Sequence, residues 1–349
     1  MQNDTNKGVV FFVLIFEYQR VEFVSANVCK LIMKRIITFL TIFVCVFSYA
    51  KVKPDADLSK KADAIYEACP KAPAVKVLKP RKILIFSRTK GWRHTEGIPA
   101  AKMAYKYMGD KLGTWQTVIS DDLENFTPEN IKQFDCIVLN NSTGMCFGES
   151  PKELAKMPEA ERNAILKKSD EICANVIEYV KNGGSIFAIH GGVDCYNHKN
   201  IRNDAFVEML GGEFISHPWF IDNKPVTFVI DDMQSPITKG IWNTDNFKIR
   251  DEIYLLGKSY DRKKCRVLMR IDTKRSPITR KGQNKIYPEG DYATAYIKSF
   301  GKGRIAYTVI GHAENNYLDK KCQEFHLRML QFCCGDLKAD TSSIDFAKK

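Results

Sequence analysis

The sequence predicts an α/β protein with a mainly parallel sheet, helices on both of its faces and an appended β-rich portion. Short unbroken apolar runs at residues 82–86, 136–139 and 185–189 are typical of strands that are buried on both faces. Helical patterns separate these runs, as parallel strands require. The second half instead carries several strand patterns with few helices between them.

The first half alternates strands and helices. Residues 51–80 are rich in Lys, Ala and Pro, and we expect a leader segment with room for one helix. The strand patterns that follow lie at 82–86, 117–119, 136–139 and 185–189, and the helical patterns at 99–112, 126–134 and 160–180. The last helix ends before Gly183 and Gly184, which are typical of a helix C-terminus.

The second half predicts strands and one closing helix. The strand patterns lie at 226–230, 252–256, 266–271, 292–299 and 304–310, and the helix at 317–334. The turn at 299–303 predicts that the last two strands form a hairpin. No internal repeat is visible. We therefore expect one domain over 81–335, followed by a C-terminal tail at 336–349, and not two independent folding units.

Composition restricts the class of protein. The chain has 349 residues, 44% hydrophobic and 27% charged, with a formal net charge of +12. These values exclude a disordered chain, a collagen-like repeat and a polytopic membrane protein. The basic residues are spread out and form no long run, so no nucleic-acid partner is predicted.

Residues 33–50 have the pattern of a secretory signal. Met33-Lys34-Arg35 gives a basic start, residues 36–47 are apolar, and Ser48 and Ala50 are the small residues that a signal peptidase requires. The apolar run is too short to span a bilayer. We expect Met33 to be the true start, residues 1–32 to be a misannotated extension, and the mature chain to be exported to the periplasm.

Histidines recur where strands end. Open parallel sheets bind ligands at the carboxyl ends of their strands. His94, His190 and His312 each follow a predicted strand, whereas His217 lies in a predicted loop before one, and Asp251-Glu252 opens another. The candidate catalytic residues are therefore His94, His190, His217, Asp251 and Glu252.

The turn at His190 is the most informative position. In hydrolases and amidotransferases, a sharp turn of this kind presents a Ser or Cys nucleophile. Here His190 precedes Gly191-Gly192, and this argues against glutaminase and Ser-His-Asp chemistry. Imidazole at this place suits a general acid or base, or a metal ligand. The candidate metal ligands are His94, His190, His217 and His312, with Zn²⁺ as the expected ion. A metal-free cluster of structural histidines is the alternative.

Four further residues are candidates for binding substrate: Trp92, Asn140, Trp219 and Tyr254. Flat rings beside polar groups suit stacking against a sugar, although core packing explains the same rings equally well. The loop after residues 82–86 lacks the hydroxyl-rich character of a flavin phosphate site. We therefore expect neither a nucleotide nor a flavin, and a redox carrier is disfavoured.

An ordered set of motifs gives the chain a family resemblance. The motifs are KILIFS at 82–87, GWRH at 91–94, GGSIFAIHGG at 183–192, FISHP at 214–218, SPIT at 235–238, DEIY at 251–254, YATAY at 292–296 and GKGRIAYTVIGH at 301–312. Together they resemble the trehalose-utilisation, ThuA-like family over about residues 81–335. The resemblance implies a flavodoxin-like three-layer sandwich of the class I glutamine amidotransferase-like type, in which the catalytic Cys is absent.

The resemblance also implies a role in sugar catabolism, alongside a sugar oxidoreductase. We expect an exported enzyme that acts on a glycoside or an oxidised (keto) sugar, with a small carbohydrate as its partner and a homo-oligomer left open. The alternative is a non-catalytic periplasmic carbohydrate-binding protein that uses the same cleft, with Asn140 and Asn141 as hydrogen-bonding groups. An insert around residues 145–160 distinguishes the chain from shorter members of the family.

Overall fold

The structure is a computed structural model that describes residues 54–198, 201–220, 224–276, 278 and 291–344. Residues 1–52 and 53–349 separate into two units, and all the described residues belong to the second. The predicted extension and signal peptide lie outside the described residues. Among the described helices, none is long and apolar enough to cross a membrane.

A nine-stranded sheet organises the chain in the order β2-β1-β3-β5-β13-β12-β11-β8-β9. Its first five strands pair in parallel. They are β2 (Gln116–Ile119), β1 (Lys82–Phe86), β3 (Cys136–Asn140), β5 (Ser185–Ile189) and β13 (Gly303–Thr308). This is the order of a flavodoxin-like sheet. The prediction of a mainly parallel α/β sheet is therefore confirmed.

The β-rich second half continues the same sheet with antiparallel pairs. These strands are β12 (Ala293–Phe300), β11 (Arg266–Ile271), β8 (Val226–Ile230) and β9 (Asn246–Ile249). The predicted hairpin is β12–β13, closed where Phe300 pairs with Gly303. Because β13 pairs with β5 on its other side, the appended strands share the core of the parallel half.

Two small sheets lie outside the main one. β7 (Phe214–Trp219) pairs antiparallel with β10 (Ile253–Leu256), and β4 (Thr143–Gly144) pairs parallel with β6 (Asp194–Cys195). β10 also contacts β12, and β4 and β6 both contact the turn that follows β5. The small sheets therefore lie beside the strands that carry the candidate histidines.

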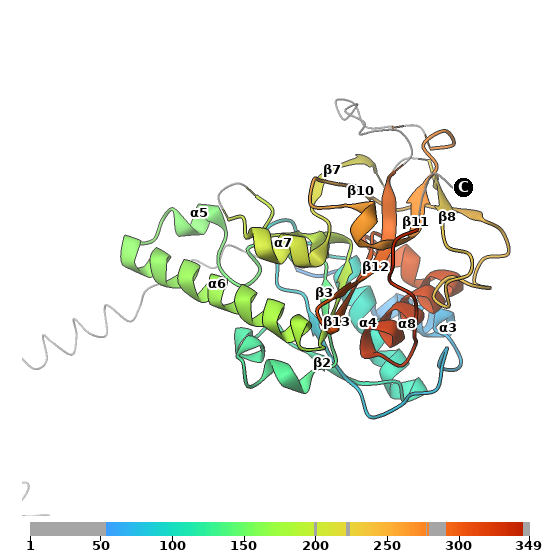
Figure 1. Ribbon diagram of the computed structural model, residues 1–349, viewed down its shortest axis with the longest axis horizontal. Helices are drawn as coiled ribbons and strands as arrows, with labels where there is room; N and C mark the ends of the chain where they lie inside the picture. Colours follow the sequence, from blue (N-terminus) through green and yellow to red (C-terminus); the bar gives the residue numbers. More distant parts are fainter. Residues whose placement is uncertain (1–53, 199–200, 221–223, 277, 279–290, 345–349) are drawn as a thin grey trace, which may run out of the picture. The chain divides into compact units, whose positions relative to one another are not determined.

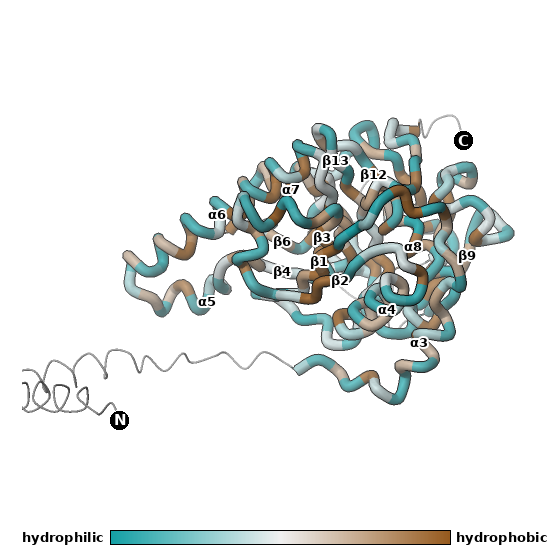
Figure 2. Tube along the Cα trace, turned by 90° about the horizontal axis from the view of Figure 1, so that it is seen from below, coloured by the Kyte–Doolittle hydropathy of each residue, from teal (hydrophilic) through white to brown (hydrophobic). Residues whose placement is uncertain are grey.

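Helices cover both faces of the main sheet (Figure 1). α3 (Ala62–Ala68), α4 (Gly97–Leu112) and α8 (Lys320–Cys334) pack together, whereas α6 (Glu159–Lys181) packs with α7 (Asp204–Leu210). Both α6 and α8 contact β5 and β13, so the layers are helix, sheet and helix. The strands between them are largely apolar and buried, and brown segments lie at β1 and β3 in Figure 2.

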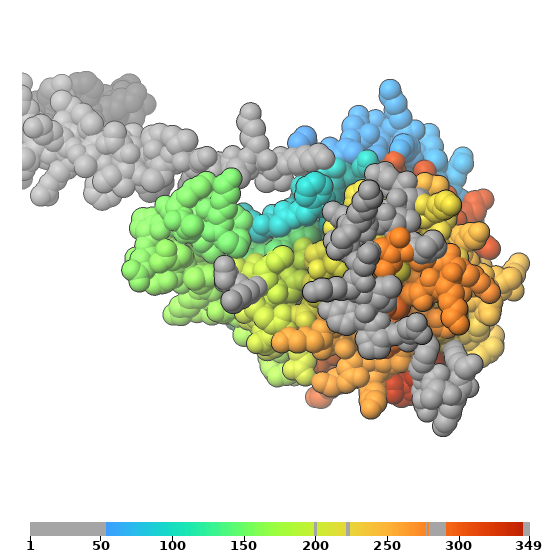
Figure 3. Space-filling view, turned by 90° about the horizontal axis from the view of Figure 1, so that it is seen from above, coloured from blue at the N-terminus to red at the C-terminus, as the bar shows by residue number. Residues whose placement is uncertain are grey.

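The insert predicted around residues 145–160 contains α5 (Pro151–Leu154) and leads into α6. In Figure 3 the green atoms of this part project away from the yellow and orange atoms of the second half. Its beginning is tied to the loop after β1, because Arg88 and Lys90 pair with Glu149 at 3.1 and 2.5 Å. The insert thus starts close to the loop that carries His94.

Three sequence predictions were wrong in detail. Residues 126–134 form no helix but two 3₁₀ turns, Leu123–Phe126 and Ile131–Gln133, because Pro128 forces Thr127 into an extended conformation. His217 lies in β7 and not in a loop, since pairing with β10 defines that strand.

The closing helix starts at Lys320, where Asp319 caps it by accepting from the amides of Lys321 and Cys322. α7 and β9 were not predicted.

Candidate active site: a histidine–glutamate cluster

Three parallel strands deliver histidines to one place. His94 follows β1, His190 follows β5 and His312 follows β13. Their rings lie 4.7 to 5.1 Å apart, centroid to centroid. One ligand atom from each of them lies within 4.8 Å of the others and of a Glu252 oxygen. We call His94, His190, His312 and Glu252 the histidine cluster.

The chain reverses sharply at His190, as the sequence predicts. His190 adopts φ 44°, a left-handed conformation that is uncommon for residues other than glycine. His190 is also the first residue of a single 3₁₀ turn, His190–Val193. A Cβ at Gly191 would lie 3.0 Å from Cε1 of His94 and 2.9 Å from Thr143. Glycine at position 191 therefore allows the two histidines to approach each other.

Hydrogen bonds orient the His190 ring. Its Nδ1 lies 3.0 Å from the Val309 carbonyl oxygen, which can only accept, so Nδ1 carries a proton. Its Nε2 lies 3.3 Å from Oε2 of Glu252. In neutral His190 this would place a lone pair against a carboxylate. The contact is favourable only if Nε2 carries a proton or a cation lies between the two atoms.

Glu252 connects two histidines. Its Oε1 lies 2.6 Å from Nδ1 of His217, and its Oε2 faces His190. Burial alone would raise the pKa of Glu252, but the hydrogen bonds from His190 and His217 outweigh it and hold the pKa well below its ordinary value. Glu252 is therefore an ionised carboxylate at neutral pH. His217, with its side chain 23% exposed, lies on the solvent side of the cluster.

His94 and His312 are neutral imidazoles at neutral pH. Burial lowers the pKa of His94 well below its ordinary value, and burial together with His190 lowers that of His312 to about 4. Nε2 of His94 lies 3.3 Å from the Tyr254 hydroxyl. The Nδ1 atoms of both rings are buried and have no hydrogen-bond partner among the described residues. Neutral rings with uncommitted nitrogens are suited to accept a proton or bind a cation.

Asp251 has a different position from its neighbour. Its Oδ2 accepts the backbone amides of Gly311, at 2.9 Å, and His312, at 3.4 Å. Burial raises the pKa of Asp251 to about 7. The side chain therefore holds the turn that presents His312, and these contacts fit a positioning role.

The four predicted substrate-binding residues differ in exposure. Trp92 is 68% exposed, while Trp219 is 2% exposed and donates from Nε1 to the Ser276 carbonyl at 2.8 Å. Asn140 is fully buried and donates to Ser87 and to the Ile98 carbonyl. Tyr254 packs on His190 with centroids 4.0 Å apart. Trp92 is thus the exposed ring of this set, whereas Trp219 and Asn140 stabilise the fold.

Asn141 connects the strand ends, a role that the sequence did not suggest. It follows β3 with φ 55°, and its side chain donates to the Gly311 carbonyl at 3.1 Å and accepts from the Gly191 amide at 3.4 Å. One side chain therefore connects the turns after β5 and β13. The available signal was an Asn directly after an apolar strand, because Asn tolerates the left-handed conformation.

The fold is an α/β fold with a nine-stranded mixed sheet, and His190 lies in the sharp turn directly after β5. The family model described as ThuA, trehalose utilisation, matches residues 82–333. The chain belongs to that family.

One solved structure shares the fold, and two others match it less well. A ThuA-like protein from Bacteroides uniformis is 20% identical, with a TM-score of 0.55 over 76% of this chain and 93% of that one. A ThuA-like protein from Parabacteroides merdae is 14% identical, with a TM-score of 0.47 over 76% and 98%. A β-galactosidase from Bacillus circulans is 8% identical, with a TM-score of 0.43 over 74% and 32%. No curated protein matches the chain.

Proposed function

We propose that this protein is a sugar-catabolism enzyme that acts on a glycoside or an oxidised (keto) sugar at the histidine cluster. One observation carries the proposal: in a chain of the trehalose-utilisation family, ligand atoms of three histidines and one glutamate converge within 4.8 Å. They do so at the carboxyl ends of parallel strands, where such sheets bind ligands.

The cluster contains the groups that proton transfer requires. Ionised Glu252 holds the imidazoles of His190 and His217 in place. His312, with a pKa of about 4 and a side chain 18% exposed, is a neutral base that a substrate can reach. In the proposed reaction His312 accepts a proton from water or from the carbon next to a keto group, and His217, which pairs with Glu252, donates one to the leaving oxygen.

The same residues fit a divalent metal ion. His94, His190, His312 and Glu252 supply nitrogen and oxygen donors of the kind that Zn²⁺ binds, and the Val309 carbonyl fixes the tautomer that presents Nε2 of His190. Such an ion would polarise a carbonyl or lower the pKa of a bound water. We propose these four residues as its ligands, with His217 acting through Glu252 rather than as a ligand. With an ion bound, His312 would be a ligand, so its role as a base belongs to the metal-free cluster.

Metal binding is tested on the full chain by zinc titration followed by dialysis and elemental analysis. We expect about one equivalent in the wild type and a loss in His312→Asn. The matched control is His198→Asn, which changes a histidine outside the cluster. Equal zinc retention in His312→Asn and the wild type would refute this ligand set.

Export is part of the proposal and depends on the signal-like pattern at residues 33–50. An exported enzyme would take its keto sugar from an oxidoreductase that oxidises a sugar hydroxyl. Cell fractionation with mass spectrometry of the N-terminus tests this. A mature N-terminus near residue 51 in the periplasm is expected, and peptides from residues 2–29 in the native protein would contradict it.

The enzyme is tested by incubating the full chain with a panel of glycosides and their keto derivatives. Product formation, followed by NMR, is the expected result. The alternative, a carbohydrate-binding protein that uses exposed Trp92, predicts a sugar-dependent thermal shift without any product. A thermal shift with no product across the panel would favour that alternative.

A further inference from the structure

A pocket lies between β9 and the start of α8. Its volume is about 330 Å³, and none of its lining residues belongs to the cluster. The lining residues are Trp242, Phe247, Lys248, Ile249, Arg250, Asn315, Asn316, Asp319, Lys321 and Cys322. Small-molecule sites range from roughly 300 to 1,000 Å³, so this pocket has room for a ligand of monosaccharide size.

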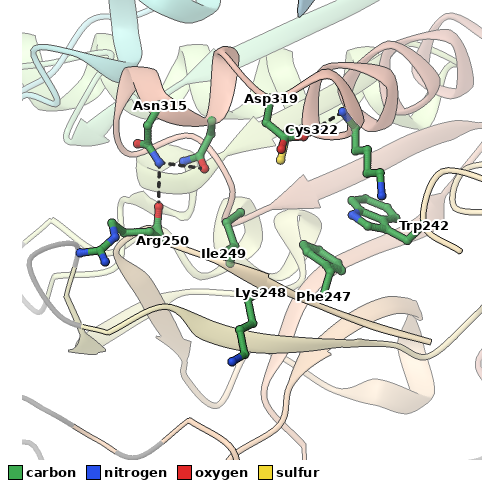
Figure 4. A pocket seen from close by; sticks show the side chains of 10 residues that line it. Trp242, Phe247, Lys248, Ile249, Arg250, Asn315, Asp319 and Cys322 are labelled. Carbon is green, nitrogen blue, oxygen red and sulfur yellow. Dashed lines mark hydrogen bonds between the residues drawn. The ribbon is translucent and has the colours of Figure 1, made fainter. Parts of the chain in front are cut away.

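One wall of the pocket is apolar. The rings of Trp242 and Phe247 stack with centroids 4.3 Å apart and an angle of 12° between their planes, and Ile249 lies beside them. In Figure 4, Asn315 and Asp319 lie opposite this wall. The Lys248 and Arg250 side chains extend away from the space between Asn315 and Phe247 (Figure 4). The pocket thus has apolar rings on one side and polar groups on the other, and Lys321 also lines it beside Asp319.

Asn316 points to a ligand. The residue is only 2% exposed, and its Nδ2 has no hydrogen-bond partner in the described part of the chain. A buried amide donor without a partner is unfavourable, so a donor in this state at a pocket wall favours a ligand with an acceptor. Its neighbour Asn315 is already engaged, donating to the Arg250 carbonyl at 2.9 Å.

We propose that this pocket binds a neutral, hydroxyl-rich ligand of monosaccharide size. A sugar ring presents an apolar face, which suits the Trp242–Phe247 wall, and hydroxyl groups that both donate and accept. Asn316 would donate to one hydroxyl, and the carboxylate of Asp319 would accept from another. A neutral ligand fits better than an anionic one because the charges of Asp319 and Lys321, both of which line the pocket, oppose each other, while the Lys248 and Arg250 side chains extend away from it.

Fluorine NMR on the full chain labelled with fluorotryptophan tests this proposal. The chain has four tryptophans, and Trp242→Phe assigns the resonance that reports on the pocket. Glucose is the probe. We expect a saturable shift of the Trp242 resonance in the wild type and the same shift in His190→Ala. The shift of the Trp242 resonance is then independent of the histidine cluster. This proposal can therefore fail without affecting the proposed function, and the proposed function can fail without affecting this proposal.

A second experiment replaces the side-chain amide of Asn316. Asn316→Leu, similar in size but without the donor, is expected to weaken glucose binding at least tenfold, and Asn182→Leu, on the exposed end of α6, is expected to leave it unchanged. If Asn316→Leu does not fold, Asn316→Asp replaces it. No saturable shift with glucose, a shift produced by glucuronate or inorganic phosphate instead, or unchanged binding in the folded Asn316 variant would each overturn the proposal.

Discussion

At the scale of single residues, the backbone at His190 is under strain. Its φ of 44° costs about 1–2 kcal/mol for a residue with a Cβ and little for glycine. We predict that His190→Gly is more stable than His190→Ala by about 1 kcal/mol, although both lack the imidazole. Urea unfolding of the two variants measures the difference. Equal stability, or a more stable alanine variant, would contradict the strain at this turn.

Two tryptophans that look alike in the sequence have opposite roles. Trp219→Ala should cost about 3–5 kcal/mol of unfolding free energy, because the ring is 2% exposed and its Nε1 is hydrogen-bonded. Trp92→Ala should cost little stability, since Trp92 is 68% exposed, but should weaken sugar binding. Thermal unfolding and titration with a substrate of the wild type distinguish the two. A large loss of stability in Trp92→Ala would refute the assignment.

Two adjacent residues also have different roles that the sequence cannot distinguish. Asp251 and Glu252 are neighbours, yet one holds the Gly311–His312 amides and the other joins the histidines. Sequence patterns placed both at one strand start, and only the direction of each side chain assigns the role. The histidines after β1, β5 and β13 were predictable because a parallel sheet brings the carboxyl ends of its strands together.

At the scale of elements, the start of α4 packs on the turn that presents His312. A Cβ at Gly97 would overlap the carbonyl oxygens of Gly311 and His312. Gly97→Ala should therefore destabilise the protein by about 1–3 kcal/mol and lower activity by displacing His312. The control is Gly148→Ala, where the new methyl group meets only the flexible Met145 side chain. Calorimetry and turnover are the measurements, and a neutral Gly97→Ala would contradict this packing.

The predictable elements are those whose signal is local. The parallel strands were identified from unbroken apolar runs, and α6 from its long helical spacing. β7 was missed because its strand character depends on pairing with β10, which follows more than thirty residues later and in which Ile253 pairs with Trp219. The spacing of apolar residues at 126–134 is helical, yet Pro128 prevents a continuous helix because it makes the preceding residue extended.

At the scale of the whole molecule, a buried histidine in the core links stability to pH. Burial lowers the pKa of His326 from 6.5 to about 3, and its Nδ1 lies 2.9 Å from the Tyr105 hydroxyl. Because the unfolded state binds this proton more readily, His326 supports stability fully above pH 6.5, and that support is lost as pH falls from 6.5 toward 3.

In His326→Gln, the side chain at position 326 no longer binds a proton in this pH range. Between pH 6.5 and 3 the unfolding free energy of the variant should fall less steeply than that of the wild type, by up to about 1.4 kcal/mol per pH unit. Urea unfolding across this range measures the slope. His198→Gln is the control, because a hydrogen bond with Asp194 raises the pKa of His198 and gives it the opposite pH dependence. A slope unchanged in His326→Gln would contradict the prediction.

The central claim is that the histidine cluster of this ThuA-family chain processes a sugar. Turnover of a glycoside or keto sugar confirmed as substrate, compared between the full-length wild type and Glu252→Gln, tests it most directly. We predict a loss of at least about 100-fold in turnover, because the shared carboxylate orients two imidazoles, and no loss in Glu208→Gln, an exposed glutamate on α7. A folded Glu252→Gln with wild-type turnover would contradict the account.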